Sequence, residues 1–330
     1  MKRNQKVVWT LAAVIVAGSL QGLAAGEDKA AGIMAETRKA IGGRKLEGMK
    51  SFSVQAKVQR NMGNIQLASD VEFLLEMPDK FLRSEAITGG PMPMAITTTA
   101  GFNGTTPLGR VNAPGMPGGA GMVIRMGSGG TMGGGGTEKL TPEQQAEISA
   151  NVLRTTRNDI SRLMLGWFGT AHPVLPVEYV YAGEAESPDG RAHVIDVKGA
   201  GDFAARLFID QDTHLPLMLT YKAPQMRMTM GGMRQGGPGG AGAASRPAGR
   251  EMTEEEREKM RAEIEKMRAQ PPEMVEYSLF FGDWREADGI KFPHSIQRAA
   301  GGTTDEEWTL SKPRVNPKID PKKFLPDTSE

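Results

Sequence analysis

The residues best suited to acid–base chemistry or metal binding are four histidines, His172, His193, His214 and His294. No two of them have the spacing of metal ligands on one helix, and no H-E-x-x-H motif occurs. The nucleophile motif G-x-S-x-G is absent, and the chain has no cysteine. We therefore expect no catalytic residue, no metal site and no cofactor, and we interpret the chain as a protein other than an enzyme.

Two groups of acidic residues could suggest other chemistry. Asp305, Glu306 and Glu307 might form an acid–base pair, but we interpret them as solvated charges at the end of a strand. Asp210 and Asp212 could suggest calcium, yet this stretch supplies too few oxygen ligands for that ion. A polar hairpin turn explains the second group better.

Methionines form two clusters of soft sulfur atoms. Thioethers bind copper(I), and a location outside the cytoplasm would permit such a role. Because no histidine or cysteine lies close by, we favour the alternative that these residues are flexible apolar side chains of an adaptable surface. The residues concerned are Met92, Met94, Met226, Met228, Met230 and Met233.

The first 25 residues have the order of a secretory signal. Lys2, Arg3 and Lys6 precede an apolar run, 7–20, and small residues follow it. A transmembrane anchor is the alternative, but it needs about 20 apolar residues and this run is shorter. We expect cleavage near residue 25 and a mature protein, residues 26–330, in the periplasm or outside the cell.

The charge and composition of the mature chain exclude some partners. Loss of the three signal cations takes the formal net charge from +1 to −2. Nucleic acid would require a dense cationic face, so we expect no nucleic-acid partner. Without cysteines there are no disulfides, and the fold must be stabilised by an ordinary hydrophobic core.

Alternating apolar residues predict strands in the first third of the chain. In 52–59 every second residue is apolar, which is typical of a half-buried strand. Residues 65–76 alternate in the same way and should pair with the first strand as a hairpin. Residues 81–87 and 95–102 are the third and fourth predicted strands.

Two helices can be placed from local signals. Residues 29–42 are predicted to be helical and to end at a Gly-Gly pair. Thr141, Pro142 and Gln144 form a capping box with proline at the first helical position. The helix that starts there should run to about Phe168 with one apolar face.

The rest of the chain predicts more strands and two insertions. The insertions, at about 104–137 and 224–250, are rich in Gly, Met and Pro and should be flexible linkers. A charged helix should follow the second one, at about 253–268. Seven further strands are predicted at 177–181, 192–197, 203–209, 215–221, 274–284, 290–298 and 303–313. The fold class is mainly β with α (α+β), in a single domain.

Five short segments resemble one known family. They are strand ends and hairpin turns at 207–210, 215–217, 277–284, 288–293 and 316–320. Together they resemble the periplasmic lipoprotein-sorting carriers of the LolA/LolB type and their wider relatives of unknown ligand, over roughly residues 30–324. The resemblance implies an open, half-rolled antiparallel β-barrel of about eleven strands. It also implies a concave apolar face, covered by helices, that accepts acyl chains.

Two functions remain open at this point. The chain is either an exported carrier of an acyl chain, a lipidated protein or another apolar ligand, or a structural or interaction protein of the cell envelope with no small ligand. In the carrier, the apolar phase of the strands and one helical residue should line the cavity. The candidate lining residues are Val54, Phe73, Leu75, Trp167, Leu207, Leu217 and Leu279.

Overall fold

The computed structural model describes residues 23–62, 65–89, 96–112, 141–188, 190–224, 258 and 273–326. These residues form one twelve-stranded antiparallel sheet with the order β5-β4-β3-β2-β1-β12-β11-β10-β9-β8-β7-β6. The strands before the long helix are β1 (Ser51–Met62), β2 (Ile65–Glu76), β3 (Lys80–Gly89), β4 (Thr97–Asn103) and β5 (Thr106–Asn112). Those after it are β6 (Val177–Ser187), β7 (Gly190–Gly199), β8 (Ala204–Asp210), β9 (Pro216–Pro224), β10 (Met274–Ala287), β11 (Ile290–Ala300) and β12 (Thr303–Val315).

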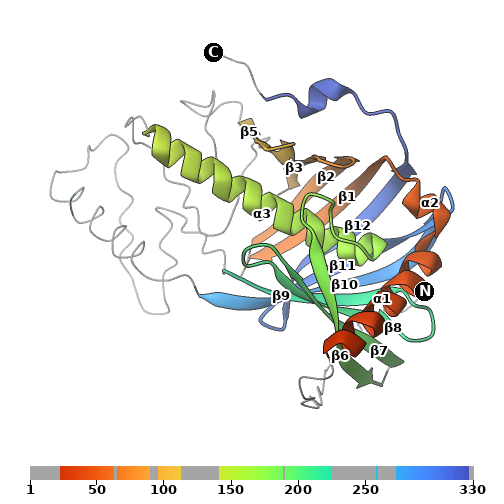
Figure 1. The fold of residues 1–330 in the computed structure, drawn as a ribbon. Coiled ribbons are helices and arrows are strands. Elements are labelled where there is room, and N and C mark those ends of the chain that lie inside the picture. The colour runs from red at the N-terminus through yellow and green to blue at the C-terminus, as the bar shows by residue number, and fades with distance from the viewer. Residues whose placement is uncertain are drawn as a thin grey trace.

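The sheet curves around its longest helix, α3 (Pro142–Phe168), which lies on the concave side (Figure 1). We call the face toward α3 the inner face and the opposite one the outer face. Helix α1 (Leu23–Ile41) packs against β6 and β11, and α2 (Arg44–Glu47) follows it directly. A 3-10 turn, η2 (Pro321–Phe324), covers part of the outer face beside β3.

Helix α3 begins and ends at the predicted residues because its signals are local. The Thr141 hydroxyl accepts a hydrogen bond from the Gln144 amide at 3.3 Å, and the Gln144 side chain accepts one from the Thr141 amide at 3.0 Å. Gly169 ends the helix in the left-handed conformation, with φ of 62°. A residue with a Cβ atom would be strained there, so the stop is encoded at that position.

The first and last strands are neighbours in the middle of the sheet. β1 pairs with β2 on one side and with β12 on the other, with Arg60 opposite Glu306. Asn316, just after β12, strengthens this junction: its side-chain oxygen accepts hydrogen bonds from the Lys50 and Ser51 amides at 2.6 and 3.2 Å. The chain ends are thus tied together on one side of the sheet.

The prediction of about eleven strands was one too few, and the first insertion begins later than predicted. Residues 106–112, assigned to a flexible segment because of their composition, form β5. Hydrogen bonding to β4 and burial of Leu108 against Leu74, Leu82 and Phe324 offset the cost of ordering them. The sheet stays open, with β5 and β6 as its two edges. The mainly β class with covering helices is confirmed.

Several predicted features lie outside the described residues. These are the signal segment up to residue 22, the insertions beyond Asn112 and Pro224, the charged helix apart from residue 258, and all six clustered methionines. Helix α1 starts at Leu23, earlier than the predicted residue 29. None of the described helices has the length and apolar character needed to cross a membrane.

Candidate functional site

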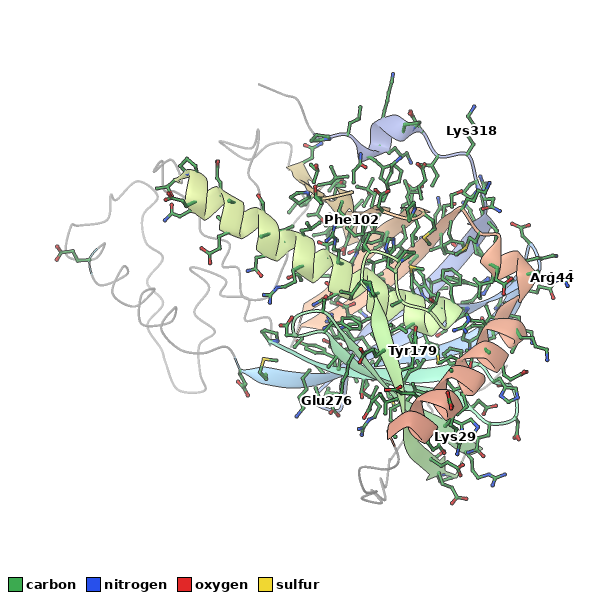
Figure 2. All side chains as sticks on the ribbon, in the orientation of Figure 1. Lys29, Arg44, Phe102, Tyr179, Glu276 and Lys318 are labelled. Atoms are coloured by element: carbon green, nitrogen blue, oxygen red, sulfur yellow. The ribbon has the colours of Figure 1, made fainter. Side chains whose placement is uncertain are left out.

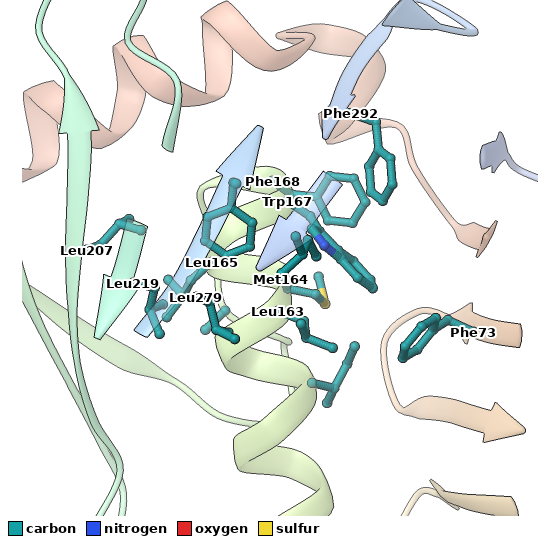
Figure 3. Close-up of a cluster of buried hydrophobic side chains, with 14 of the residues drawn as sticks. Phe73, Leu163, Met164, Leu165, Trp167, Phe168, Leu207, Leu219, Leu279 and Phe292 are labelled. Carbon is teal, nitrogen blue, oxygen red and sulfur yellow. The ribbon is translucent and has the colours of Figure 1, made fainter. Parts of the chain in front are cut away.

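Most of the predicted lining residues meet on the inner face. Six of the seven belong to one hydrophobic cluster and are at most 4% exposed. They come from β1, β2, α3, β8 and β10, and α3 lies among them (Figure 3). We call this cluster the apolar floor. The six residues are Val54, Phe73, Leu75, Trp167, Leu207 and Leu279.

Leu217 does not belong to the floor. A β-bulge between β8 and β9 places Phe208 opposite Met218 and Ile209 opposite Pro216, so Leu217 has no direct partner. It packs, half-buried, against a second cluster on the outer face that includes Phe208 and Met218. The sequence alternation could not reveal this, because a bulge moves a residue out of phase with its neighbours.

Helix α3 fills the floor with aromatic side chains. The Trp167 ring lies 5.5 Å from that of Phe73 and 5.3 Å from that of Phe292, measured between centroids. Gly166 allows the helix to approach this closely, because a Cβ atom there would lie 1.9 Å from the ring of Phe281. Side chains occupy the space between the sheet, α1 and α3, with Tyr179 where β6 meets α1 (Figure 2).

The helix–sheet interface also buries polar atoms that lack a partner. Ser161 Oγ, Trp167 Nε1 and His172 Nε2 make no hydrogen bond with any described residue. Each such atom costs roughly 1–3 kcal/mol when it is removed from water. Burial, together with Arg157, lowers the pKa of His172 to about 4, so the imidazole is neutral at neutral pH. The seat of α3 is therefore apolar but imperfectly satisfied.

At one end of the strands the inner face changes from apolar to charged. On β1 the phase Phe52, Val54, Ala56, Val58 continues to Arg60, and on β3 the residues after Phe81 are Arg83 and Glu85. The same end of β11 carries Arg298, and that of β12 carries Asp305 and Glu306. We call these six residues, with Asp159 and Arg162 of α3, the charged collar: Arg60, Arg83, Glu85, Arg298, Asp305 and Glu306.

Ion pairs connect the collar across the sheet. Glu306 accepts hydrogen bonds from Arg60 at 2.8 Å and from the Trp308 indole at 2.8 Å, and it lies 2.8 Å from Arg298. Arg60 also donates to Glu85. Arg298 forms two further bonds with Asp305, at 3.1 and 2.7 Å. Glu306 is therefore a buried hub, 4% exposed, and its interpretation as a solvated strand-end charge was wrong.

Helix α3 adds a second layer to the collar. Arg162 donates to Asp159 at 3.0 Å, and its guanidinium lies 4.1 Å from the ring centre of Tyr221. That ring stacks on Tyr277, which in turn lies 5.4 Å from the Arg298 guanidinium. The tyrosine pair thus bridges the helix cations to those of the sheet.

The collar shifts the ionisation of its carboxylates. Burial alone would raise the pKa of Glu85, but Arg83 and Arg60 outweigh it and lower that pKa to about 2. Arg298 and Arg60 likewise overcome burial and lower the pKa of Glu306. Both carboxylates therefore remain ionised at any pH above about 5.

The remaining polar candidates do not assemble into a site. Among the described residues no three His, Asp or Glu side chains are placed to hold a metal ion. His214 lies in the β8–β9 turn, and His294 Nδ1 lies 3.1 Å from the Phe292 carbonyl oxygen. Asp210 accepts hydrogen bonds from the Asp212 and Thr213 amides, as the hairpin-turn interpretation predicts.

Comparison with known proteins gave structural neighbours but no sequence relatives. No protein-family model and no curated protein sequence matches the chain. Three solved structures are similar to it. A LolA superfamily protein from Nitrosomonas europaea is 10% identical, with 90% of this chain and 97% of that chain covered and a TM-score of 0.45.

The other two structures are equally distant. One is a DUF1329 family protein from Desulfovibrio piger, at 10% identity, 91% and 97% coverage and a TM-score of 0.44. The other is a putative outer membrane lipoprotein-sorting protein domain from Vibrio parahaemolyticus, at 10% identity, 90% and 97% coverage and a TM-score of 0.42. The family that the sequence resembles is thus named among its structural neighbours. At 10% identity, function has to be argued from the residues of this chain.

Proposed function

We propose that the mature protein is an exported carrier that holds an acyl chain, or another apolar group, on the inner face of its sheet. The observation that carries this proposal is the partial seating of α3. All buried positions of this helix lie between Thr156 and Phe168, whereas Pro142–Thr155 is exposed or half-buried. Only half of the helix holds it on the floor, and that half can be exchanged for a ligand.

The energies of the two states are similar. Burying one large apolar side chain stabilises a protein by about 1.5–3 kcal/mol, so five contribute roughly 8–15 kcal/mol. An acyl chain of about 16 methylenes gains roughly 13 kcal/mol in the same surroundings. When the helix lifts, Ser161 Oγ and Trp167 Nε1 also regain water. The five residues that an acyl chain would replace are Ile160, Leu163, Met164, Trp167 and Phe168.

The export part of the proposal rests on the first 25 residues. Cleavage near residue 25 would leave most of α1 on the mature chain, still packed against β6. N-terminal sequencing of the protein recovered from the cell envelope tests this, and an intact Met1 would contradict it.

A removable cross-link across α3 tests the carrier proposal. Arg154 of α3 and Asp202 of the β7–β8 turn form an exposed ion pair at 3.4 Å, and the chain has no cysteine of its own. Arg154→Cys with Asp202→Cys, joined by a cleavable bismaleimide, should hold α3 on the floor. We expect the linked protein to lose binding of a fluorescent fatty acid and to regain it when the linker is cut.

A matched control is available on the sheet itself. Lys57 of β1 and Asp70 of β2 form an exposed ion pair at 3.5 Å and do not involve α3. The same cross-link between Lys57→Cys and Asp70→Cys should leave binding unchanged. Equal binding by the linked and unlinked α3 variant would show that the helix does not gate the floor.

A second candidate function is a structural or interaction protein whose inner face is filled by its own side chains. The observation that favours it is the near-complete burial of the floor, with Phe73, Trp167 and Leu207 all 0% exposed. Native mass spectrometry with lipid extraction separates the two. A stoichiometric lipid supports the carrier, whereas a clean apo mass without fatty-acid binding supports the interaction protein.

A further inference from the structure

Two arginines of the collar have hydrogen-bond donors that no described residue accepts. A guanidinium carries five N–H groups. Arg83 donates to Glu85 at 2.8 Å and Arg162 donates to Asp159 at 3.0 Å, yet the buried Nε atoms of both lack a partner. The Arg162 side chain is only 9% exposed, so it cannot satisfy these donors freely with water.

Asp159 marks where an acceptor would sit. Desolvation by the surrounding chain raises the pKa of Asp159, while the guanidiniums of Arg162, Arg83 and Arg298 act in the opposite direction. Its side chain is nevertheless 59% exposed, so solvent reaches this recess. One carboxylate among three cations leaves room for a second anionic group.

The same two arginines touch the aromatic lining of the inner face. The Arg83 guanidinium lies 5.7 Å from the ring centre of Phe73 and 5.6 Å from that of Trp308, both of which belong to the buried core. Arg162 lies over Tyr221 and is 5.5 Å from Phe203. An apolar chain on the floor would therefore end beside these cations.

We propose that Arg83 and Arg162 bind the anionic group, a carboxylate or phosphate, of an amphiphile whose chain lies on the apolar floor. This inference rests on the proposed carrier function and adds the chemical class of its ligand. In the free protein Asp159 occupies part of the site, and it competes with the ligand for Arg162. Guanidinium–carboxylate and guanidinium–phosphate pairs are charge-assisted, and their geometry favours two parallel bonds.

Two probes with the same chain separate the headgroup from the floor. Oleate and oleyl alcohol are titrated by calorimetry at about pH 8, where the carboxylate is ionised. We expect oleate to bind about 10- to 100-fold more tightly than the alcohol. Arg162→Gln should remove most of this preference without changing alcohol affinity, and Asp159→Asn should raise oleate affinity by about 3- to 10-fold.

The controls keep each outcome decisive. Arg206→Gln removes an arginine that is paired with Asp196 on the other face of the sheet, and it should leave both affinities unchanged. Arg83→Gln provides a second loss variant if Arg162→Gln fails to fold, and the gain expected for Asp159→Asn does not depend on either. Inorganic phosphate, titrated alone, shows whether an anion without a chain is sufficient.

The failures of the two proposals differ in what is observed. Equal affinity of the wild-type protein for oleate and oleyl alcohol would overturn the headgroup site and leave the carrier standing. Binding of neither probe would overturn the carrier and the headgroup site together. Phosphate binding that is lost in Arg162→Gln would support the anion site and identify a free anion as sufficient.

Discussion

The apolar floor and the charged collar lie on the same face of the same strands, yet they are stabilised by different forces. The floor depends on buried area, and its weak points are single polar atoms such as Trp167 Nε1 that lack partners. In the collar each buried carboxylate is paired, and Glu306 alone contacts two arginines and an indole. Area tolerates small changes in proportion to their size, whereas loss of one ionic partner leaves another charge buried.

The largest effect is expected from truncating the floor. Trp167→Ala should lower the free energy of unfolding by about 3–5 kcal/mol, because it opens a cavity below α3. Urea denaturation followed by circular dichroism measures this. Trp284→Ala, at a half-buried tryptophan of β10, is the control and should cost clearly less. Equal losses would show that the floor is not the main core.

A drop in pH should destabilise the two regions in different windows. His172, with its pKa lowered from 6.5 to about 4, favours the unfolded state as pH falls from 6.5 to 4. Glu85, with its pKa lowered from 4.5 to about 2, keeps its full contribution above pH 4.5 and loses it between 4.5 and 2. That shift corresponds to roughly 3 kcal/mol.

Unfolding free energies measured between pH 7 and 2 test both windows. Glu85→Gln should flatten the curve below pH 4.5 and leave the region above it unchanged. His172→Asn should flatten the higher region only. A curve that changes in both windows for either variant would contradict the assignment of one window to each region.

A smaller loss is expected from removing one charge at the hub of the collar. Glu306→Gln should cost about 1.5–3 kcal/mol, because Arg60 and Arg298 lose a charged acceptor while the side-chain shape is kept. The adjacent Glu307→Gln is the control, since Glu307 is exposed, and it should stay within about 0.5 kcal/mol of wild type. Similar values for the two variants would show that the network contributes little.

The smallest effect should come from the residue that the sequence misplaced. Leu217→Ala should cost about 1 kcal/mol or less, because the side chain is half-buried on the outer face. Leu207→Ala, at 0% exposure in the floor, should cost about 2–5 kcal/mol. Fatty-acid binding should fall only in the Leu207 variant. A loss of binding in the Leu217 variant would return that residue to the ligand site.

The sequence predicted local features well and long-range ones less well. The start and end of α3 follow from a capping box and a glycine, which act within a few residues. β5 was missed because its composition resembles a linker, and its pairing with β4 is not visible in its own residues. Leu217 was misplaced because the bulge that turns it outward depends on the register between β8 and β9.

The charged collar was missed although a signal for it is present. The alternation from Phe52 to Val58 was followed only as far as it stayed apolar, and the next residue in phase is Arg60. Its partner Glu306 lies 246 residues away, so neither residue alone identifies a buried pair. Charged residues that continue an apolar strand phase are therefore worth treating as inward-facing.

The central pairing of β1 with β12 also governs when this protein can fold. A chain that crosses a membrane with its amino end first delivers β1 early and β12 last. Until β12 arrives, β1 has only β2 beside it, and the sheet is divided into two groups of strands with no shared core. Loop closure over this length is slow and entropically unfavourable, so the fold cannot be completed during transit. A late closing strand thus keeps the chain threadable until all of it has emerged.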